Sequence, residues 1–148
     1  MALAAIAVIV LFVLSPAPGP RLRVRDADTG HTFACYRLAE GDEFAVEFVH
    51  SINRTPYADL YTLRGGQIYM TGLRYFSFGA GVPEDLDPAW TLTLTEDGGM
   101  LVTGMDTVLS RIVYRVGTIF DHFLLLPDGT VNLRELCGRN TRVWLVYG

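Results

Sequence analysis

The histidines and their polar neighbours are the side chains of this sequence whose types could do chemistry. His50 continues the alternation of Val46 and Phe48, so it is expected on the same strand face as these apolar residues. Ser51 points to the opposite face if the strand continues, and the two side chains then cannot act together as base and nucleophile. His50 is either a hydrogen-bonded histidine at the edge of the core or a site residue at the mouth of a sandwich or barrel. Both interpretations predict that it is at least partly buried.

Two carboxylates offer another route to acid-base chemistry. Asp59 follows His50 on the next expected strand, and Asp121 stands directly before His122. A hydrolase would pair His50 with Asp59 or Asp121, and it would need these groups within hydrogen-bond reach. The histidines (His31, His50 and His122) share no ligand spacing, so the sequence predicts neither a metal site nor a cofactor.

A glycine-rich loop follows an aromatic segment near the middle of the chain. It contains Gly79 and Gly81, whose backbone amides could form a small nest for an anion. Arg54 or Arg74 would approach this nest from neighbouring strands. The alternative is a turn that uses glycine for its positive φ angles.

A pair of arginines could also receive a carboxylate. Arg111 and Arg115 are expected on one face of a strand from Val108 to Val116, and guanidinium groups suit bidentate recognition. The alternative is an outer face solvated through salt bridges. No catalytic residue is assigned, and the candidate contact residues for a ligand or partner are His50, Ser51, Arg54, Asp59, Arg74, Gly79, Gly81, Arg111, Arg115 and His122.

Several of these residues carry a resemblance to a known family. The motifs are His50-Ser51-Ile52, Thr55-Pro56, Asp59 and Phe78-Gly79-Ala80-Gly81-Val82-Pro83. They resemble an uncharacterised bacterial family, a domain of unknown function found in short anchored or exported proteins encoded beside TRAP (tripartite ATP-independent periplasmic) transporters of the TAXI type. The similarity runs from about Phe33 to the segment ending near His122, and Asp59 stands where glutamate is expected. The resemblance implies a location and a partner, either the permease or its solute-binding protein, but no activity.

Composition limits the classes of protein that fit. The chain has 148 residues, half of them hydrophobic, which suits one well-buried domain. Its net charge is −4, with no lysine and twelve scattered arginines. No basic stripe is present, so nucleic acid is not a predicted partner.

The beginning of the chain has a different character from the rest. Residues 1–14 are entirely apolar, residues 15–20 are rich in proline, and residues 21–148 form the expected β-domain. Fourteen helical residues span roughly 21 Å, less than the ~30 Å hydrocarbon core. We expect an uncleaved or inefficiently cleaved membrane anchor, which would hold the domain on the periplasmic side of the inner membrane. The alternative is a buried N-terminal helix or strand.

Two cysteines lie near opposite ends of the expected domain. In an exported protein, Cys35 and Cys137 would form a disulfide that contributes about 4 kcal/mol. The alternative is a pair of buried free thiols.

The remaining pattern predicts an all-β fold. Strand-sized segments alternate with Gly and Asp turns, and no amphipathic helix stands out. This pattern is typical of an antiparallel β-sandwich or a partly open barrel, here preceded by a short hydrophobic N-terminal helix. Leu92 and Leu94 are expected to face inward from one of the strands. Gly65 and Gly66 are expected to form the turn of a hairpin whose second strand bends at Gly72.

These observations favour an accessory binding or assembly protein of a TAXI-type TRAP uptake system, as the resemblance implies. A pocket around His50, Arg54, Asp59 and the Gly79–Gly81 loop would contact the ligand or partner. Two alternatives stay open, a small periplasmic hydrolase and a structural module of the cell envelope.

Overall fold

A computed structural model describes residues 19–52, 54–77 and 86–148 of the chain. The hydrophobic segment, most of the linker and the glycine loop lie outside these residues. Within them the chain forms strands and a short helix: β1 (Arg21–Asp26), β2 (Thr32–Arg37), β3 (Glu43–Val49), β4 (Pro56–Arg64), β5 (Gln67–Tyr75), β6 (Thr91–Leu94), β7 (Met100–Leu109), β8 (Ile112–Arg115), β9 (His122–Leu126), β10 (Gly129–Asn132), α2 (Leu133–Cys137) and β11 (Arg142–Tyr147).

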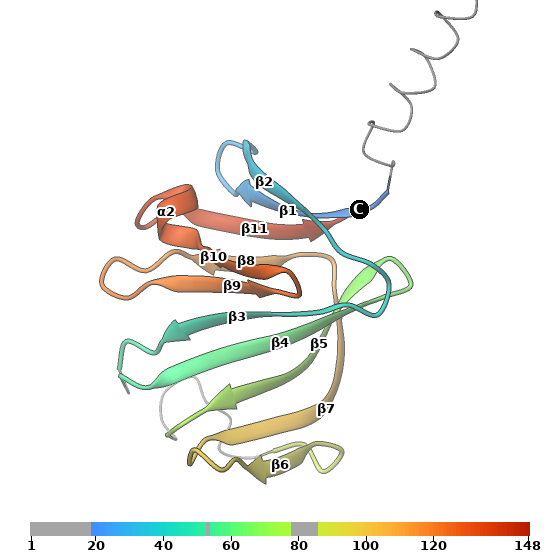
Figure 1. The fold of residues 1–148 in the computed structure, drawn as a ribbon, viewed down its shortest axis with the longest axis vertical. Coiled ribbons are helices and arrows are strands. Elements are labelled where there is room, and N and C mark those ends of the chain that lie inside the picture. Colours follow the sequence, from blue (N-terminus) through green and yellow to red (C-terminus); the bar gives the residue numbers. More distant parts are fainter. Residues whose placement is uncertain (1–18, 53, 78–85) are drawn as a thin grey trace, which may run out of the picture.

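The strands form two antiparallel sheets. Sheet A has the order β2-β1-β11-β8, and sheet B has the order β10-β9-β3-β4-β5-β7-β6 (Figure 1). The sheets do not close into a barrel, so the prediction of an all-β antiparallel fold is confirmed in its sandwich form. No helix in the described part of the chain is long and apolar enough to cross a membrane.

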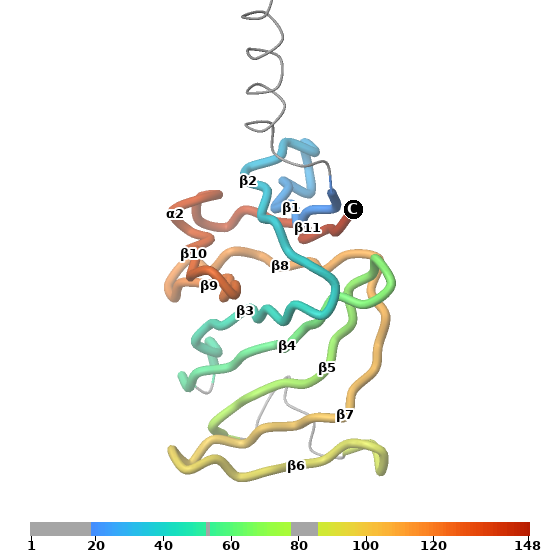
Figure 2. The backbone as a smooth tube through the Cα atoms, turned by 45° about the vertical axis from the view of Figure 1, so that its right-hand side comes forward, coloured from blue at the N-terminus to red at the C-terminus, as the bar shows by residue number. Residues whose placement is uncertain are grey.

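The larger hydrophobic core lies between the two sheets. Sheet A contributes Val24 and Leu145, and sheet B contributes Val46 and Leu124, all fully buried. We call this cluster the two-sheet core; its buried residues are Leu22, Val24, Leu38, Phe44, Val46, Tyr61, Leu63, Ile68, Ile112, Val116, Leu124, Leu133, Val143 and Leu145. Figure 2 shows the strands of sheet A above β9, β3 and β4 of sheet B, and this core contains side chains from both groups of strands.

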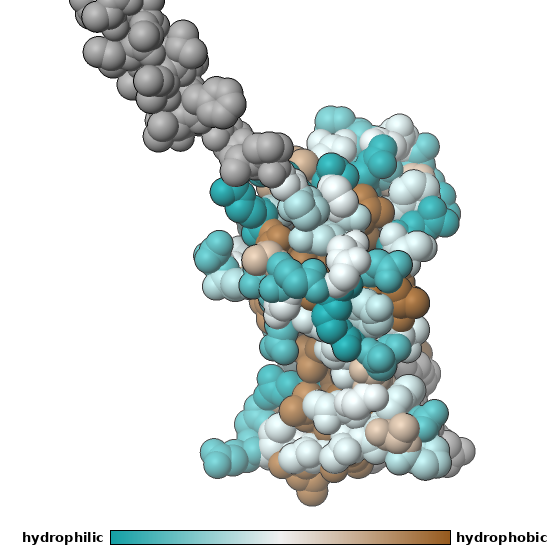
Figure 3. Space-filling model, turned by 90° about the vertical axis from the view of Figure 1, so that its right-hand side faces the viewer, coloured by the Kyte–Doolittle hydropathy of each residue, from teal (hydrophilic) through white to brown (hydrophobic). Residues whose placement is uncertain are grey.

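A smaller core lies farther along sheet B, where sheet A no longer covers it. We call it the one-sheet core; its buried residues are Leu73, Tyr75, Met100, Val102 and Met105. Partly buried Leu86 and Trp90, from the segment before β6, pack against it. Figure 3 shows the outline of the molecule narrowing between the two halves.

The hairpin of β4 and β5 follows the sequence prediction closely. Gly65 and Gly66 form its turn, both with positive φ, as a tight two-residue turn requires. The expected bend near Gly72 is a register shift between Met70 and Gly72. A Cβ atom on Gly72 would lie only 2.3 Å from the carbonyl oxygen of Val102, so only glycine allows β5 and β7 to pair here.

Two local predictions are wrong, and one short element was missed. Leu92 and Leu94 are exposed rather than inward, because β6 is an edge strand beyond the cover of sheet A. The strand expected from Val108 to Val116 is divided between β7 and β8, which belong to different sheets. Helix α2 was not predicted, because a single turn is too short to show helical periodicity.

Candidate functional site

A pocket of about 350 Å³ lies where β3 ends and β9 begins, at the left of Figure 1. We call it the histidine pocket. It is lined by Phe48, Val49, His50, Ser51, Arg115, Val116, Gly117, Thr118, Ile119, Phe120, His122 and Asn140. Four of the predicted contact residues line this pocket, namely the neighbours His50 and Ser51 together with Arg115 and His122 from later in the chain.

The floor of the pocket is a stacked pair of rings. Phe48 and His122 are direct partners in the pairing of β3 with β9, and their ring centroids are 4.8 Å apart with an interplanar angle of 12°. Tyr114 from sheet A meets both rings edge-on. The two sheets therefore clamp His122 in one orientation.

The proton of His122 is placed by its backbone partner. The N–H of Gly117 donates to Nδ1 of His122 at 3.2 Å, which leaves Nε2 to carry the proton of the neutral ring. Burial lowers the pKa of His122, which favours this neutral form. A Cβ atom on Gly117 would lie 2.1 Å from the carbonyl oxygen of Phe120, so the tight turn depends on glycine.

A half-buried carboxylate, that of Asp59, lies behind this floor. The hydroxyl of Tyr114 donates to Oδ2 of Asp59, and the hydroxyls of Tyr61 and Tyr114 are 2.7 Å apart. Burial raises the pKa of Asp59, and hydrogen bonds from Tyr114, Tyr57 and Tyr61 act against that rise. This group, the Asp59 network, links sheet B to sheet A by a polar chain inside an apolar core.

His50 lies at the pocket rim, just after the end of β3. It is half-buried, as both interpretations of the sequence predicted. Its backbone N–H donates to the carbonyl oxygen of Thr55 at 2.9 Å, and its own carbonyl oxygen accepts from the N–H of Arg54 at 2.8 Å. The ring is 6.3 Å from that of Tyr57. Ser51 is exposed in the turn that follows.

Arg115 occupies the opposite rim. Its Nη1 donates to the backbone oxygen and to Oδ1 of Asn140, at 3.1 and 3.2 Å. Asn140 has a positive φ of 61°, which turns both of its oxygens toward the arginine. The guanidinium is thus held at the pocket mouth.

Other predicted contact residues lie elsewhere. Arg74 pairs with Asp97, and Arg111 packs on the ring of Trp144, 4.5 Å from its centroid, so the two do not join Arg115. Arg54 is exposed in the β3–β4 turn, and Gly79 and Gly81 lie outside the described residues. A hydrogen bond of 3.2 Å between Thr55 and Ser77 brings that turn next to the residue that precedes the glycine loop.

The carboxylates expected in a hydrolase have other partners. Asp121 forms an ion pair with Arg134 at 2.6 Å and accepts from the side chain of Asn132 at 3.2 Å. Asp59 is held by tyrosines in the Asp59 network. These contacts do not favour an acid-base pair with His50.

The cysteines are free thiols in this structure, with Cys35 exposed and Cys137 half-buried. Cys137 ends helix α2, where burial raises its pKa to about 11. The thiol is therefore protonated at neutral pH and is a poor nucleophile.

Three residues of the site were not predicted from the sequence. Neither Tyr114, Gly117 nor Asn140 was among the candidate contact residues. The signal for Asn140 is the turn sequence Gly138-Arg139-Asn140, since asparagine readily adopts positive φ.

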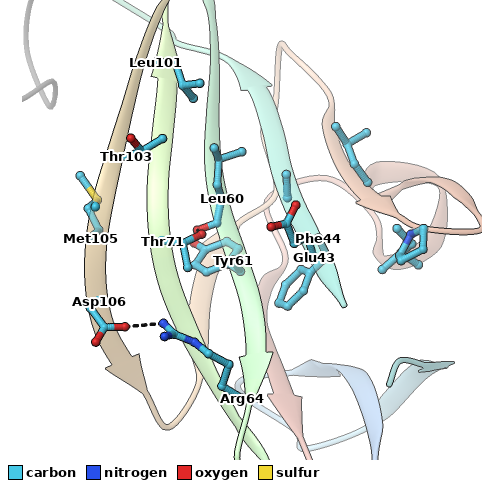
Figure 4. Close-up of a pocket in the computed structure, with 15 residues that line it drawn as sticks. Glu43, Phe44, Leu60, Tyr61, Arg64, Thr71, Leu101, Thr103, Met105 and Asp106 are labelled. Atoms are coloured by element: carbon cyan, nitrogen blue, oxygen red, sulfur yellow. Dashed lines mark hydrogen bonds and ion pairs between the residues drawn. The ribbon is translucent and has the colours of Figure 1, made fainter. Parts of the chain in front are cut away.

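A larger hollow of about 710 Å³ lies on the other face of sheet B (Figure 4). Its lining residues Ala45 and Leu125 alternate with Val46 and Leu124 of the two-sheet core. Figure 4 shows the Arg64–Asp106 ion pair closing one end. This hollow is open and carries charges of both signs, and no predicted contact residue within the described part of the chain lines it.

Within the described residues, no group of His, Cys, Asp or Glu side chains could hold a metal ion. The fold and the pocket define a small β-sandwich domain with a recess lined by histidine and arginine. The model of a domain of unknown function, DUF1850, matches residues 44–133, more than half of the chain. The chain belongs to this family. Comparisons with curated proteins and with solved structures find no match.

Proposed function

We propose that this protein is an accessory binding or assembly subunit of a TAXI-type TRAP solute uptake system. Residues 1–14 would hold it at the periplasmic face of the inner membrane, and the domain would contact the permease or its solute-binding protein. The motifs around His50 and Asp59 supply the expected partner through their family resemblance. The exposed residues around the histidine pocket supply the expected contact surface.

Exposed isoleucines beside the histidine pocket carry the proposal. Ile119 lines the pocket and is 76% exposed, and Ile52 follows the pocket residue Ser51 and is 67% exposed. Large apolar side chains around a recess are typical of surfaces that another protein covers. Arg54 and Arg115 add exposed charge near this apolar rim.

The position of the surface suits an anchored protein. Ile52 and Ile119 belong to the turns after β3 and before β9, on the left in Figure 1. The described chain begins near Arg21, on the right of the same view. A partner can therefore approach the pocket from the side opposite the start of the described chain.

Co-purification from the native host tests the proposal. The protein would carry a C-terminal tag, membranes would be solubilised gently, and partners would be identified by mass spectrometry. We expect permease subunits or the solute-binding protein, and we expect the double variant Ile52→Ser/Ile119→Ser to lose them. Leu94→Ser is the matched control, because Leu94 is 75% exposed but lies on β6.

The result that overturns the proposal is equally clear. A preparation without these partners, or equal loss of partners in the Leu94→Ser control, contradicts it. Transport gives a second readout: His50→Ala should impair uptake more than it lowers the free energy of unfolding. Parallel losses of uptake and stability would show a purely structural histidine.

A further inference from the structure

The histidine pocket has an unusual charge for this protein. The chain carries 16 acidic residues and a net charge of −4. The residues that line the pocket nevertheless include an arginine and no carboxylate. A recess with positive charge and apolar walls attracts anions and repels cations.

Arg115 is the source of this charge. Among the described residues, aspartates pair with Arg64, Arg74, Arg134 and Arg142, but no carboxylate pairs with Arg115. Within residues 19–52, 54–77 and 86–148, its acceptors are the two oxygens of Asn140, and both accept from Nη1. Nε and Nη2 thus lack acceptors within the described part of the chain, although the guanidinium is already oriented.

The other lining residues indicate that the rest of the anionic ligand is apolar. Phe48, Ile119 and Phe120 supply apolar surface, and the ring of His122 lies against Phe48. Burial lowers the pKa of His122, which favours the neutral ring, so this histidine adds no second charge to the pocket. A volume of about 350 Å³ accommodates a small molecule and not a polymer.

We propose that the histidine pocket binds a small organic monocarboxylate, with its carboxylate on Arg115 and its apolar part against Phe48 and Phe120. Arginine recognises carboxylates with two parallel hydrogen bonds, which Nε and Nη2 can supply together. The inference deepens the proposed function by naming what the accessory protein would sense or hold, and it rests on that function only for its biological setting.

Calorimetric titration of the full chain in mild detergent tests this inference. Benzoate is the probe, and benzamide is its neutral control of the same shape. We expect benzoate to bind at least about tenfold more tightly than benzamide, because a charge-assisted hydrogen-bond pair is lost with the amide. Equal affinities, or no saturable binding of benzoate up to about 10 mM, would overturn the inference.

Two variants that remove the same charge locate the site. Arg115→Gln should weaken benzoate binding by about tenfold or more, whereas Arg111→Gln should change it by less than about twofold. Arg111 is a matched control because it lies next to β8 but packs on Trp144, outside the pocket. Equal effects of the two variants would contradict a site at Arg115.

The two proposals fail in different ways. Selective binding of benzoate without co-purifying transporter subunits would overturn the proposed function and support the pocket's ligand class. Co-purification of those subunits without selective binding of benzoate would support the proposed function and overturn the pocket's ligand class.

Discussion

The two-sheet core and the one-sheet core bury apolar side chains by different means. In the two-sheet core, Leu124 of sheet B is enclosed by sheet A, which supplies Val24 and Leu145. In the one-sheet core, Leu73 is buried with help from Leu86 and Trp90 of the segment before β6. The strands of sheet A are hydrogen-bonded to one another, so the side chains that they place over the two-sheet core are held in position. The segment before β6 has no such support, and it can shift to fill a cavity made in the one-sheet core.

The polar chemistry follows the same division. The Asp59 network and His122 sit where the two sheets meet, and Tyr114 of sheet A contacts both. The strands of the one-sheet core carry no histidine. The comparison teaches that the titratable side chains Asp59 and His122 lie where both sheets hold them in a fixed orientation.

Matched leucine variants should show the largest difference between the cores. Leu124→Ala and Leu73→Ala remove the same atoms from buried sites. We expect about 3–5 kcal/mol lost for Leu124→Ala and about 2–3 kcal/mol for Leu73→Ala, because the cost grows when the surroundings cannot collapse. Urea unfolding of both variants measures this difference, and a greater loss for Leu73→Ala would contradict the comparison.

The Asp59 network offers a smaller perturbation of the two-sheet core. Tyr114→Phe removes the hydroxyl that reaches both Asp59 and Tyr61. We expect the free energy of unfolding to fall by about 1–3 kcal/mol, because a half-buried carboxylate loses a hydrogen-bond donor. Tyr147→Phe is the control, since its hydroxyl donates only to the backbone oxygen of Leu38, and it should cost about 1 kcal/mol. Equal losses in urea unfolding would show that the carboxylate does not depend on Tyr114.

Acid should weaken the two-sheet core through His122. Burial lowers its pKa below the usual 6.5, so the unfolded chain takes up this proton first as the pH falls. Stability then declines from about pH 6.5 down to the folded-state pKa, by at most about 1.4 kcal/mol per pH unit. Urea unfolding between about pH 5 and pH 8 should show a shallower decline for His122→Phe than for the natural chain.

Asp59 acts in the opposite sense and provides the control for that experiment. Burial raises its pKa above 3.8, so its contribution to stability is complete below 3.8 and is lost as the pH rises through the raised value. Asp59→Asn should therefore keep the decline that His122 causes. An unchanged decline in His122→Phe would assign the acid sensitivity to another group.

Local features were predictable from the sequence because local physics decides them. Alternation located the strands, and Gly65-Gly66 identified the tight turn of β4 and β5. The failures concern long-range arrangement. The exposure of Leu94 depends on where sheet A ends, and no pattern within residues 91–94 contains that information.

The site divides in the same way. The half-buried state of His50 followed from its strand position, whereas its meeting with Arg115 and His122 depends on how β3, β8 and β9 are brought together by the two sheets. The sequence suggested Arg111 as the companion of Arg115, but Trp144 on β11 holds Arg111 instead. In both cases the neighbour of the side chain is decided by strands that are far apart in the sequence.

The position of β11 has a consequence for the order of folding. This strand lies between β1 and β8 and pairs with both, so the β1–β2 pair joins β8 only through β11. During synthesis sheet A cannot be completed before residues 142–147 have emerged, while the contiguous β3–β4–β5 meander can pair earlier. The nascent chain therefore keeps one side of the histidine pocket open until residues 142–147 have emerged, because Arg115 reaches its place only when β8 joins β11.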